Sequence, residues 1–461
     1  MTAHNDALEA QITHWRRWLL LRPAIRGSDV EELESHLRDL VAELRANGLD
    51  ADEAFLVAVK RMGNLDAVSR EFAREHSERL WKQLVVTTSS DDAPSRNELR
   101  ESIVVIALAV AAAAAIKLPE LFGYPHIGSG DGLVDEGGIY FPNLSFFVLP
   151  FLVGYFAWKR QLDRAGCLQL ALAFAAAALA INVLPFTPAG YTQTLAGLHL
   201  PIALWLVVGI AYAGGRWRDG SGRMDFVRFS GELFIYYVLM ALGGGVLTGF
   251  TAASFAAIGT DVEWFALQWM LPCGAMGAII IGAWLVEAKQ SVIENMAPVL
   301  TRLFTPLFTA VLLALLATMV WTGSGIDMER EVLIGFDLLL AVVLGLLLYS
   351  VSARAAHAPP DAFDALQLLL VVCALVVDGV ALTAIAGRIS EFGLSPNRVA
   401  ALGENLVLLV NLAWSAWLYA RFLGGRGTFA ALERWQMAYL PVYAVWAAFV
   451  VVAFPPLFGF M

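Results

Sequence analysis

The chain has 461 residues, of which 58% are hydrophobic and only 16% are charged, and its formal net charge is −10. Soluble domains are about 45–50% apolar and about 25% charged, so this composition is not that of an ordinary soluble protein. The negative net charge argues against a nucleic-acid partner, because such a partner usually requires a basic surface.

Charged residues are concentrated in the first hundred positions. Residues 1–101 carry 14 of the 31 Lys and Arg residues and 19 of the 41 Asp and Glu residues. The stretch VVTTSSDDAPSRNE (Val85–Glu98) is rich in Ser, Thr, Asp and Pro, which is typical of a linker. We therefore predict a helical domain over residues 1–84, a linker over 85–101 and a transmembrane domain over 102–461.

Four short amphipathic helices are predicted in residues 1–84, and two of them have clear start signals. Ser28 precedes Glu31 by three residues, and Asp50 precedes Glu53 by three, which is the spacing of a capping box. The helix after Ser28 has apolar residues three and four apart, which form one face. These residues are Val30, Leu33, Leu37, Leu40, Val41 and Leu44. Four such helices can bury a small core together.

The stretch VEELESHLRDLVAELRANGLDADEAFLVAVKRMGNLDAVSREFA resembles the permease prefix domain, also described as the HAAS signalling domain. The residues that match its Gly-x-x-x-x-Glu-Ala pattern and the following Gly are Gly48, Glu53, Ala54 and Gly63. The resemblance covers roughly residues 6–80. Such domains precede bacterial permeases or occur in membrane proteins encoded near PadR-type repressors. The resemblance implies a cytoplasmic protein partner for residues 1–84; a passive folding cap is the alternative.

Eleven stretches after the linker are candidate membrane spans, because a spanning helix needs about 20 mainly apolar residues. They cover roughly residues 102–122, 141–158, 165–186, 197–214, 232–257, 265–286, 303–321, 332–352, 363–386, 397–423 and 437–457. We therefore predict an all-α polytopic membrane protein with about 11 transmembrane helices and a small four-helix N-terminal domain. Its surroundings would be the lipid bilayer of the bacterial inner membrane.

The distribution of Lys and Arg predicts the orientation. The sequence starts without the apolar core of a signal peptide, which favours a cytoplasmic N-terminus. Alternate loops then carry 13 Lys and Arg residues on the inner side and four on the outer side, as expected when basic loops remain in the cytoplasm. The outer four are Lys117, Arg330, Arg388 and Arg398. An odd number of spans would place the C-terminus outside.

Polar residues inside the spans are costly in lipid and therefore need partners or a function. Lys117 and Glu120 lie three residues apart near the end of the first span, where we expect them to pair. Asp378, in VVCALVVDGVAL, is the most costly residue, because such a carboxyl either pairs with a neighbour or retains its proton. The further polar residues in outer halves of spans are Asp337, Asn182, Gln268 and Asn411. If they converge with Asp378, they line an outward-facing polar cavity with a proton- or cation-linked site. The alternative is that each is satisfied by neighbouring side chains.

The segment GRISEFGLSPNR (Gly387–Arg398) lies between two spans and is predicted to form an ordered external corner. Gly393 can adopt a positive φ in a turn, and Ser395 followed by Pro396 is a helix start. A helix from Pro396 to about Leu423 would be about 42 Å long. The helix dipole opposes a cation in its first turn, so Arg398 needs a partner, for which Glu391 or Glu404 is close in sequence.

This corner also carries a second resemblance. The pattern Arg388-Ile389-x-x-Phe392-Gly393-Leu394-Ser395-x-Asn397-Arg398 is similar to the Arg-Ile-x-x-Tyr-Gly-Leu-Thr-x-x-Arg signature of a bacterial polytopic membrane family of unknown function. Phe392 stands in place of the usual Tyr, and Ser395 in place of the usual Thr. The resemblance implies an integral membrane protein and no particular activity. The two arginines, Arg388 and Arg398, would have a functional role, either in contact with an anion or a lipid headgroup or as a contact that keeps a gate closed. The alternative is that they only stabilise the corner.

Several catalytic and metal-binding motifs are missing. The sequence has no Gly-x-x-x-x-Gly-Lys-Ser/Thr, no His-Glu-x-x-His and no Gly-x-Ser-x-Gly, which argues against an ATPase, a zinc peptidase and a serine hydrolase. Its three cysteines are far apart, without the spacing of a metal site or a disulfide framework. We therefore expect no enzyme, no cofactor, no metal and no nucleic-acid partner.

Two functions remain after these exclusions. The first is a permease-like protein that moves a small solute or lipid, with Asp378 as the group that couples transport to protons. The second is a membrane sensor or scaffold whose N-terminal domain signals to a PadR-type regulator or another cytoplasmic partner.

Overall fold

The structure is a computed structural model that describes residues 96–461, except 128–137, 219, 289–295, 323–329 and 355–357. Before residue 96 it describes short pieces, namely 11–12, 34–35, 37–42, 44, 50, 53–55 and 57–58. The chain divides into two compact units, Met1–Pro94 and Ser95–Met461.

The described pieces of the first unit agree with two sequence expectations. Three members of the predicted apolar face are buried: Leu37, Val41 and Leu44. The backbone N–H of Glu53 donates to Asp50 Oδ1 over 2.9 Å, so Asp50 caps the helix start as its spacing predicts. The remaining start and stop signals lie outside the described residues: Ser28, Glu31, Gly48 and Gly63.

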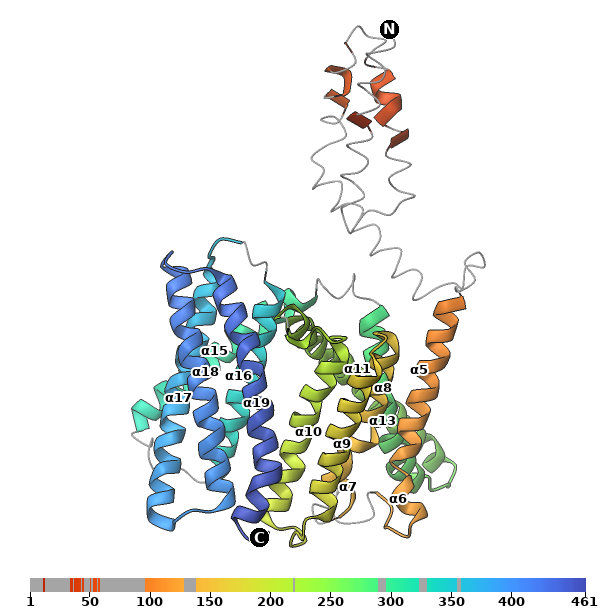
Figure 1. Ribbon diagram of the computed structural model, residues 1–461, viewed down its shortest axis with the longest axis vertical. Coiled ribbons are helices and arrows are strands. Elements are labelled where there is room, and N and C mark those ends of the chain that lie inside the picture. The colour runs from red at the N-terminus through yellow and green to blue at the C-terminus, as the bar shows by residue number, and fades with distance from the viewer. Residues whose placement is uncertain are drawn as a thin grey trace. The chain divides into compact units, whose positions relative to one another are not determined.

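The second unit is a bundle of helices, and its described residues contain no strand (Figure 1). Ten of its helical stretches are long and apolar enough to cross a membrane, and all ten coincide with predicted spans, so the all-α membrane fold is confirmed. The elements are α5 (Arg96–Ala115), α6 (Leu118–Leu121), α7 (Tyr140–Asn143), η1 (Leu144–Phe147), α8 (Leu149–Lys159), α9 (Arg164–Val183), α10 (Tyr191–Tyr212), η2 (Arg216–Arg218), α11 (Gly220–Ala257), α12 (Glu263–Phe265), the π-helical η3 (Ala266–Met270), α13 (Leu271–Ala288), α15 (Met296–Thr322), α16 (Arg330–Ala353), α17 (Ala362–Phe392), α18 (Pro396–Leu423) and α19 (Phe429–Leu457).

The predicted span at 102–122 is not among these ten stretches. The corresponding helix, α5, begins with four charged residues in its first two turns and ends at Ala115, so its apolar part is too short. It nevertheless packs against α8 and α13, and Figure 1 shows it running alongside them.

After α5, Lys117 Nζ lies 2.6 Å from Glu120 Oε1, which confirms the predicted pair. Partial burial raises the pKa of Glu120, but hydrogen bonds from Lys117 and His126 outweigh this effect, so its pKa lies below the usual value.

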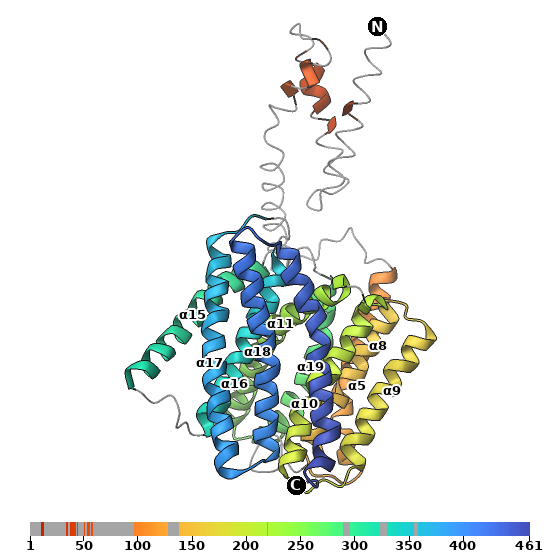
Figure 2. The same ribbon diagram turned by 60° about the vertical axis from the view of Figure 1, so that its left-hand side comes forward.

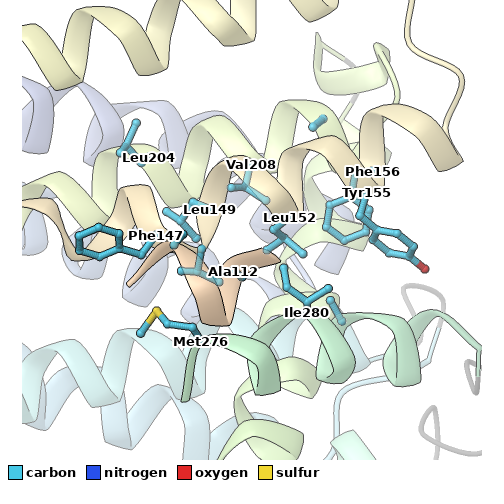
Figure 3. Packing of buried hydrophobic residues seen from close by; sticks show 14 of the residues in the cluster. Ala112, Phe147, Leu149, Leu152, Tyr155, Phe156, Leu204, Val208, Met276 and Ile280 are labelled. Carbon is cyan, nitrogen blue, oxygen red and sulfur yellow. The ribbon is translucent and has the colours of Figure 1, made fainter. Parts of the chain in front are cut away.

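Two apolar cores divide the second unit into an N-terminal and a C-terminal bundle. The N-terminal core is formed mainly by α5, α8, α9, α10 and α13, and Phe226, Phe229 and Leu233 of α11 also belong to it. Figure 3 shows side chains from four of these helices meeting, among them Ala112, Leu152, Val208 and Ile280. The C-terminal core is formed mainly by α15 to α19, and Figures 1 and 2 show α17, α18 and α19 side by side.

Large apolar side chains also cover the outer surfaces of both bundles. Phe234 is 68% exposed, Leu242 64% and Val445 68%. Water would penalise so many exposed apolar side chains, whereas hydrocarbon does not. The exposed surface therefore suits a lipid bilayer.

The two bundles are joined by α10 packing on α19 and by α11 packing on α16. Gly231 of α11 lies under the ring of Tyr349, where an added Cβ would come within 2.5 Å of the ring. Nearby, Arg228 Nη2 donates to the Ser352 carbonyl over 2.6 Å. Glycine thus permits the close approach of two helices in lipid.

Small residues four positions apart, a pattern that permits close helix packing in lipid, occur at Gly245 and Gly249 in α11 and at Gly274, Ala278 and Gly282 in α13. Close packing is found at only one of the four glycines. An added Cβ on Gly282 would lie 2.8 Å from Met240 Cε, so α13 approaches α11 closely there. The same test at Gly245, Gly249 and Gly274 meets no atom within 4 Å among the described residues. At these three positions the sequence pattern does not correspond to a contact within the chain.

A bidentate ion pair fixes the connection between α16 and α17. Arg354 Nε and Nη2 each lie 2.8 Å from an oxygen of Asp364, whose side chain is 2% exposed. The guanidinium group also donates to the Pro359 carbonyl over 2.9 Å and lies 4.4 Å from the centre of the Phe429 ring. One arginine therefore holds the α16–α17 connection against the start of α19.

We expect Arg354→Met to lower the stability of the folded protein by about 3–5 kcal/mol, because it leaves the buried Asp364 carboxylate without its cation. The measurement is thermal unfolding of the purified protein in detergent, followed by tryptophan fluorescence. Arg426→Met is the control, since Arg426 is exposed on a neighbouring turn. Equal melting temperatures for the two variants would show that the Arg354 pair adds nothing.

Candidate functional site

A cavity of about 730 Å³ lies between the N-terminal and C-terminal bundles. Residues of η1, α8, α10 and α13 line it on one side, and residues of α16, α18 and α19 line it on the other. Most of these side chains are apolar, such as Leu206, Ile279 and Leu344. The cavity is therefore an apolar space at the seam between two packed bodies.

A small number of polar side chains interrupt this apolar lining. They are Ser145, His199, Tyr237, Asp337, Glu404 and Tyr443. All the lining residues belong to the described part of the chain, and none of them is Lys or Arg. An apolar pocket with a few polar groups is the usual form of a small-molecule site.

His199 and Glu404 make a charge contact across the seam. His199 Nδ1 lies 2.8 Å from the Leu195 carbonyl oxygen of its own helix, and Nε2 lies 2.6 Å from Glu404 Oε1. The second approach lacks the alignment of a hydrogen bond, and it is an ion pair only when the imidazole is protonated. His199 is 4% exposed, and the contact connects α10 of one bundle to α18 of the other.

Two of the predicted carboxyl groups lie close together in the C-terminal bundle. Asp337 lines the cavity, and its Oδ1 accepts a hydrogen bond from Asn405 Nδ2 over 2.8 Å. The charge of Asp337 interacts with Asp378, and the charge of Glu404 interacts with Asp337. The acidic groups thus form a series from the cavity wall into the bundle.

Asp378 is the most isolated polar group of this series. It is 0% exposed, and neither of its carboxyl oxygens has a hydrogen-bond partner among the described residues. The predicted span ended at residue 386, but α17 continues through polar residues to Phe392, so Asp378 lies near the middle of the helix.

Asn411 is occupied by a hydrogen-bond network between α18 and α19. Its Nδ2 donates to Gln436 Oε1 over 3.0 Å and to the Tyr443 hydroxyl over 2.6 Å. Its Oδ1 accepts from Trp435 Nε1 over 2.7 Å. Tyr443 lines the cavity, so Asn411 reaches the site only through that hydroxyl.

Asn182 and Gln268 do not line the cavity. Asn182 exchanges two amide hydrogen bonds with Asn143, over 2.8 and 2.9 Å, which connects α9 to α7. Gln268 is half-buried on the π-helical turn η3. Of the five candidates, the structure thus brings together Asp337 and Asp378. Asn411 does not line the cavity itself, but it donates a hydrogen bond to Tyr443, which does.

The external corner is ordered by Arg398. Gly393 ends α17 with a φ of 75°, Ser395 Oγ accepts from the Arg398 N–H over 3.5 Å, and α18 begins at Pro396, as the sequence predicts. The expected partner of Arg398 was Glu391 or Glu404. Its Nη1 donates instead to the Phe392 and Gly393 carbonyls over 3.1 and 2.8 Å, because the end of α17 leaves these acceptors free. Arg388 and Asn397 are half-buried on the adjoining turns.

Sequence reasoning missed the contact between His199 and Glu404. Glu404 was considered only as a possible partner of Arg398, and no role was predicted for His199. A histidine and an acid inside apolar helices are themselves a signal of function. The contact between them depends on how the two bundles meet, which the local sequence does not contain.

Comparisons with known protein families, with curated proteins and with solved structures give no match. The two family resemblances of the sequence therefore remain predictions.

We expect Gly393→Ala to destabilise the folded protein by about 1–3 kcal/mol, because the φ of 75° and ψ of −179° at Gly393 are strained for any residue with a Cβ. An added Cβ would meet no atom within 4 Å, so strain and not a clash is the cause. Gly387→Ala, six positions earlier within α17, is the matched control. Its Cβ also meets nothing, and alanine favours the helix by about 0.5–1 kcal/mol. Thermal unfolding in detergent should move the two variants in opposite directions, and equal shifts would contradict the assignment.

Proposed function

We propose that this chain is a permease-like membrane protein that moves a small solute or lipid through the cavity between its two bundles, with proton coupling through Asp378 and Asp337. The observation that carries the proposal is Asp378, a fully buried carboxyl without a partner among the described residues, whose charge interacts with that of Asp337 at the wall of a large cavity. Ionisable residues inside a membrane domain commonly mark a transport pathway.

The position of the cavity supports a transport role. Many transporters hold their substrate at the interface of two helix bundles and rock these bundles to expose the site to each side in turn. Here the charge contact between His199 and Glu404 crosses the seam. Forming and breaking such a contact would bias the two arrangements of the bundles.

The chemistry of Asp378 supports a coupling role. An ionised carboxylate without a partner in the bilayer interior is costly, whereas the neutral acid is tolerated. Asp378 would therefore release its proton only when the seam opens and water or a cationic group reaches it. Asp337, which is held by Asn405 at the cavity wall, would relay the proton between the cavity and Asp378.

The proposed orientation has the N-terminus in the cytoplasm of a bacterium and the membrane domain in its inner membrane. It requires α5, which packs against α8 and α13, to cross the membrane together with the ten longer stretches. Basic side chains gather at the helix ends that this orientation places inside, at Lys159, Arg160, Arg228, Arg354 and Arg421. Basic residues at membrane helix ends favour the cytoplasmic side.

Labelling from both sides of the membrane tests this proposal without knowledge of the substrate. In a variant whose three cysteines, Cys167, Cys273 and Cys373, are replaced by serine, we expect Ala341→Cys at the cavity wall to react with a membrane-impermeant maleimide from either side of a vesicle. We expect an added Asp378→Asn to restrict the reaction to one side, because the amide mimics the protonated acid permanently.

Val376→Cys is the control for this labelling. Val376 is exposed near the middle of α17 and does not line the cavity, so lipid should protect it from a charged reagent. Reaction of Ala341→Cys from one side only, in the protein that retains Asp378, would refute alternating access. Unchanged two-sided reaction after Asp378→Asn would refute the role of Asp378.

A further inference from the structure

We infer that the cavity takes an amphipathic organic cation, with an apolar body and a protonated amine or quaternary onium group. This inference rests on the proposed function and specifies its substrate class. It is carried by three features of the cavity wall: its charge, its aromatic rings and its apolar area.

The charge of the wall favours a cation. Asp337 and Glu404 both line the cavity, and no lining residue is Lys or Arg. His199 can offset Glu404 by charge contact, but Asp337 has only the neutral amide of Asn405 as a hydrogen-bond donor in the described structure. In a site of low dielectric constant an anion beside these carboxylates would be strongly repelled.

Aromatic rings surround the acidic groups. Trp205, Tyr237, Tyr443 and Trp446 all line the cavity. The ring of Trp446 packs directly on the backbone of Gly403, where no Cβ could be accommodated, and this places it beside Glu404. Aromatic faces attract organic cations, and cages of such rings recognise quaternary ammonium groups.

The apolar part of the wall sets the shape of the ligand. Leucine, isoleucine, valine and alanine side chains from six helices face the cavity, whose volume of about 730 Å³ suits a drug-sized molecule. A small hydrated cation would leave this surface without contacts, and a neutral hydrocarbon would leave the acids unpaired. An organic cation with an apolar body can contact the apolar side chains and also pair with the acidic groups.

A pair of probes with the same shape and opposite charge tests the inference. Purified full-length protein in detergent is dialysed against tetraphenylphosphonium or tetraphenylborate, and protein-free micelles give the non-saturable background. We expect saturable binding of tetraphenylphosphonium, at least about tenfold tighter than that of tetraphenylborate. Equal affinity for the two ions, or the absence of saturable tetraphenylphosphonium binding, would overturn the inference.

Variants assign the binding to this cavity. We expect Asp337→Asn and Glu404→Gln each to weaken tetraphenylphosphonium binding by about tenfold, whereas Asp337→Glu keeps the charge and most of the binding. Asp261→Asn, in an exposed loop away from the cavity, is the control and should bind normally. If both acid variants bind as well as the control at an unchanged melting temperature, the ion lies elsewhere and the inference fails.

The two proposals fail separately. If selective binding is absent but Ala341→Cys is still labelled from both sides, the inference about the cation fails and the proposal of a permease stands. If Ala341→Cys is labelled from one side only but tetraphenylphosphonium still binds selectively, the proposal of transport fails and the cavity is a cation-binding site.

Discussion

Hydrocarbon offers no hydrogen bonds, and this constraint governs how the polar side chains of residues 96–461 are arranged. Several of the polar groups considered above are satisfied within the chain. Asn411 is held by Gln436 and Trp435, Asn182 by Asn143, and Arg398 by free carbonyl oxygens. Asp378 differs, because its two oxygens have no such partner among the described residues. Other buried polar atoms of the described residues also lack a hydrogen-bond partner, such as Ser145 Oγ, Tyr349 Oη and Trp446 Nε1. A carboxyl group is costlier to leave without a partner than a hydroxyl or an indole N–H, which makes Asp378 the candidate for function.

The arrangement of the two bundles determines what surrounds the Asp378 carboxyl group. Each bundle has its own apolar core, and α11 contributes side chains to both cores. The seam between them is held by the α10–α19 and α11–α16 contacts and contains the cavity. Asp337, Glu404 and His199 place ionisable groups where the two bodies meet. A change of charge at this seam would therefore act on the relative position of the bundles, which is what coupled transport requires.

Local sequence patterns predicted the helices and their ends well, and the contacts between helices poorly. Ser395 and Pro396 gave the start of α18, and the Lys117–Glu120 spacing gave an ion pair. Both depend on residues a few positions apart. The contact between His199 and Glu404, which the sequence did not predict, involves groups brought together by packing. A membrane helix is apolar on most of its faces, so its sequence does not show which face meets a neighbour.

The most direct measurement of the central claim is a density map of the full-length protein in lipid nanodiscs. The account predicts a cavity at the level of the hydrocarbon core, bounded by His199 and Glu404 on facing bundles, with Asp337 at its wall and Asp378 buried behind it without a cationic partner. A map in which the bundles close directly on each other, or in which a Lys or Arg side chain reaches Asp378, would contradict it.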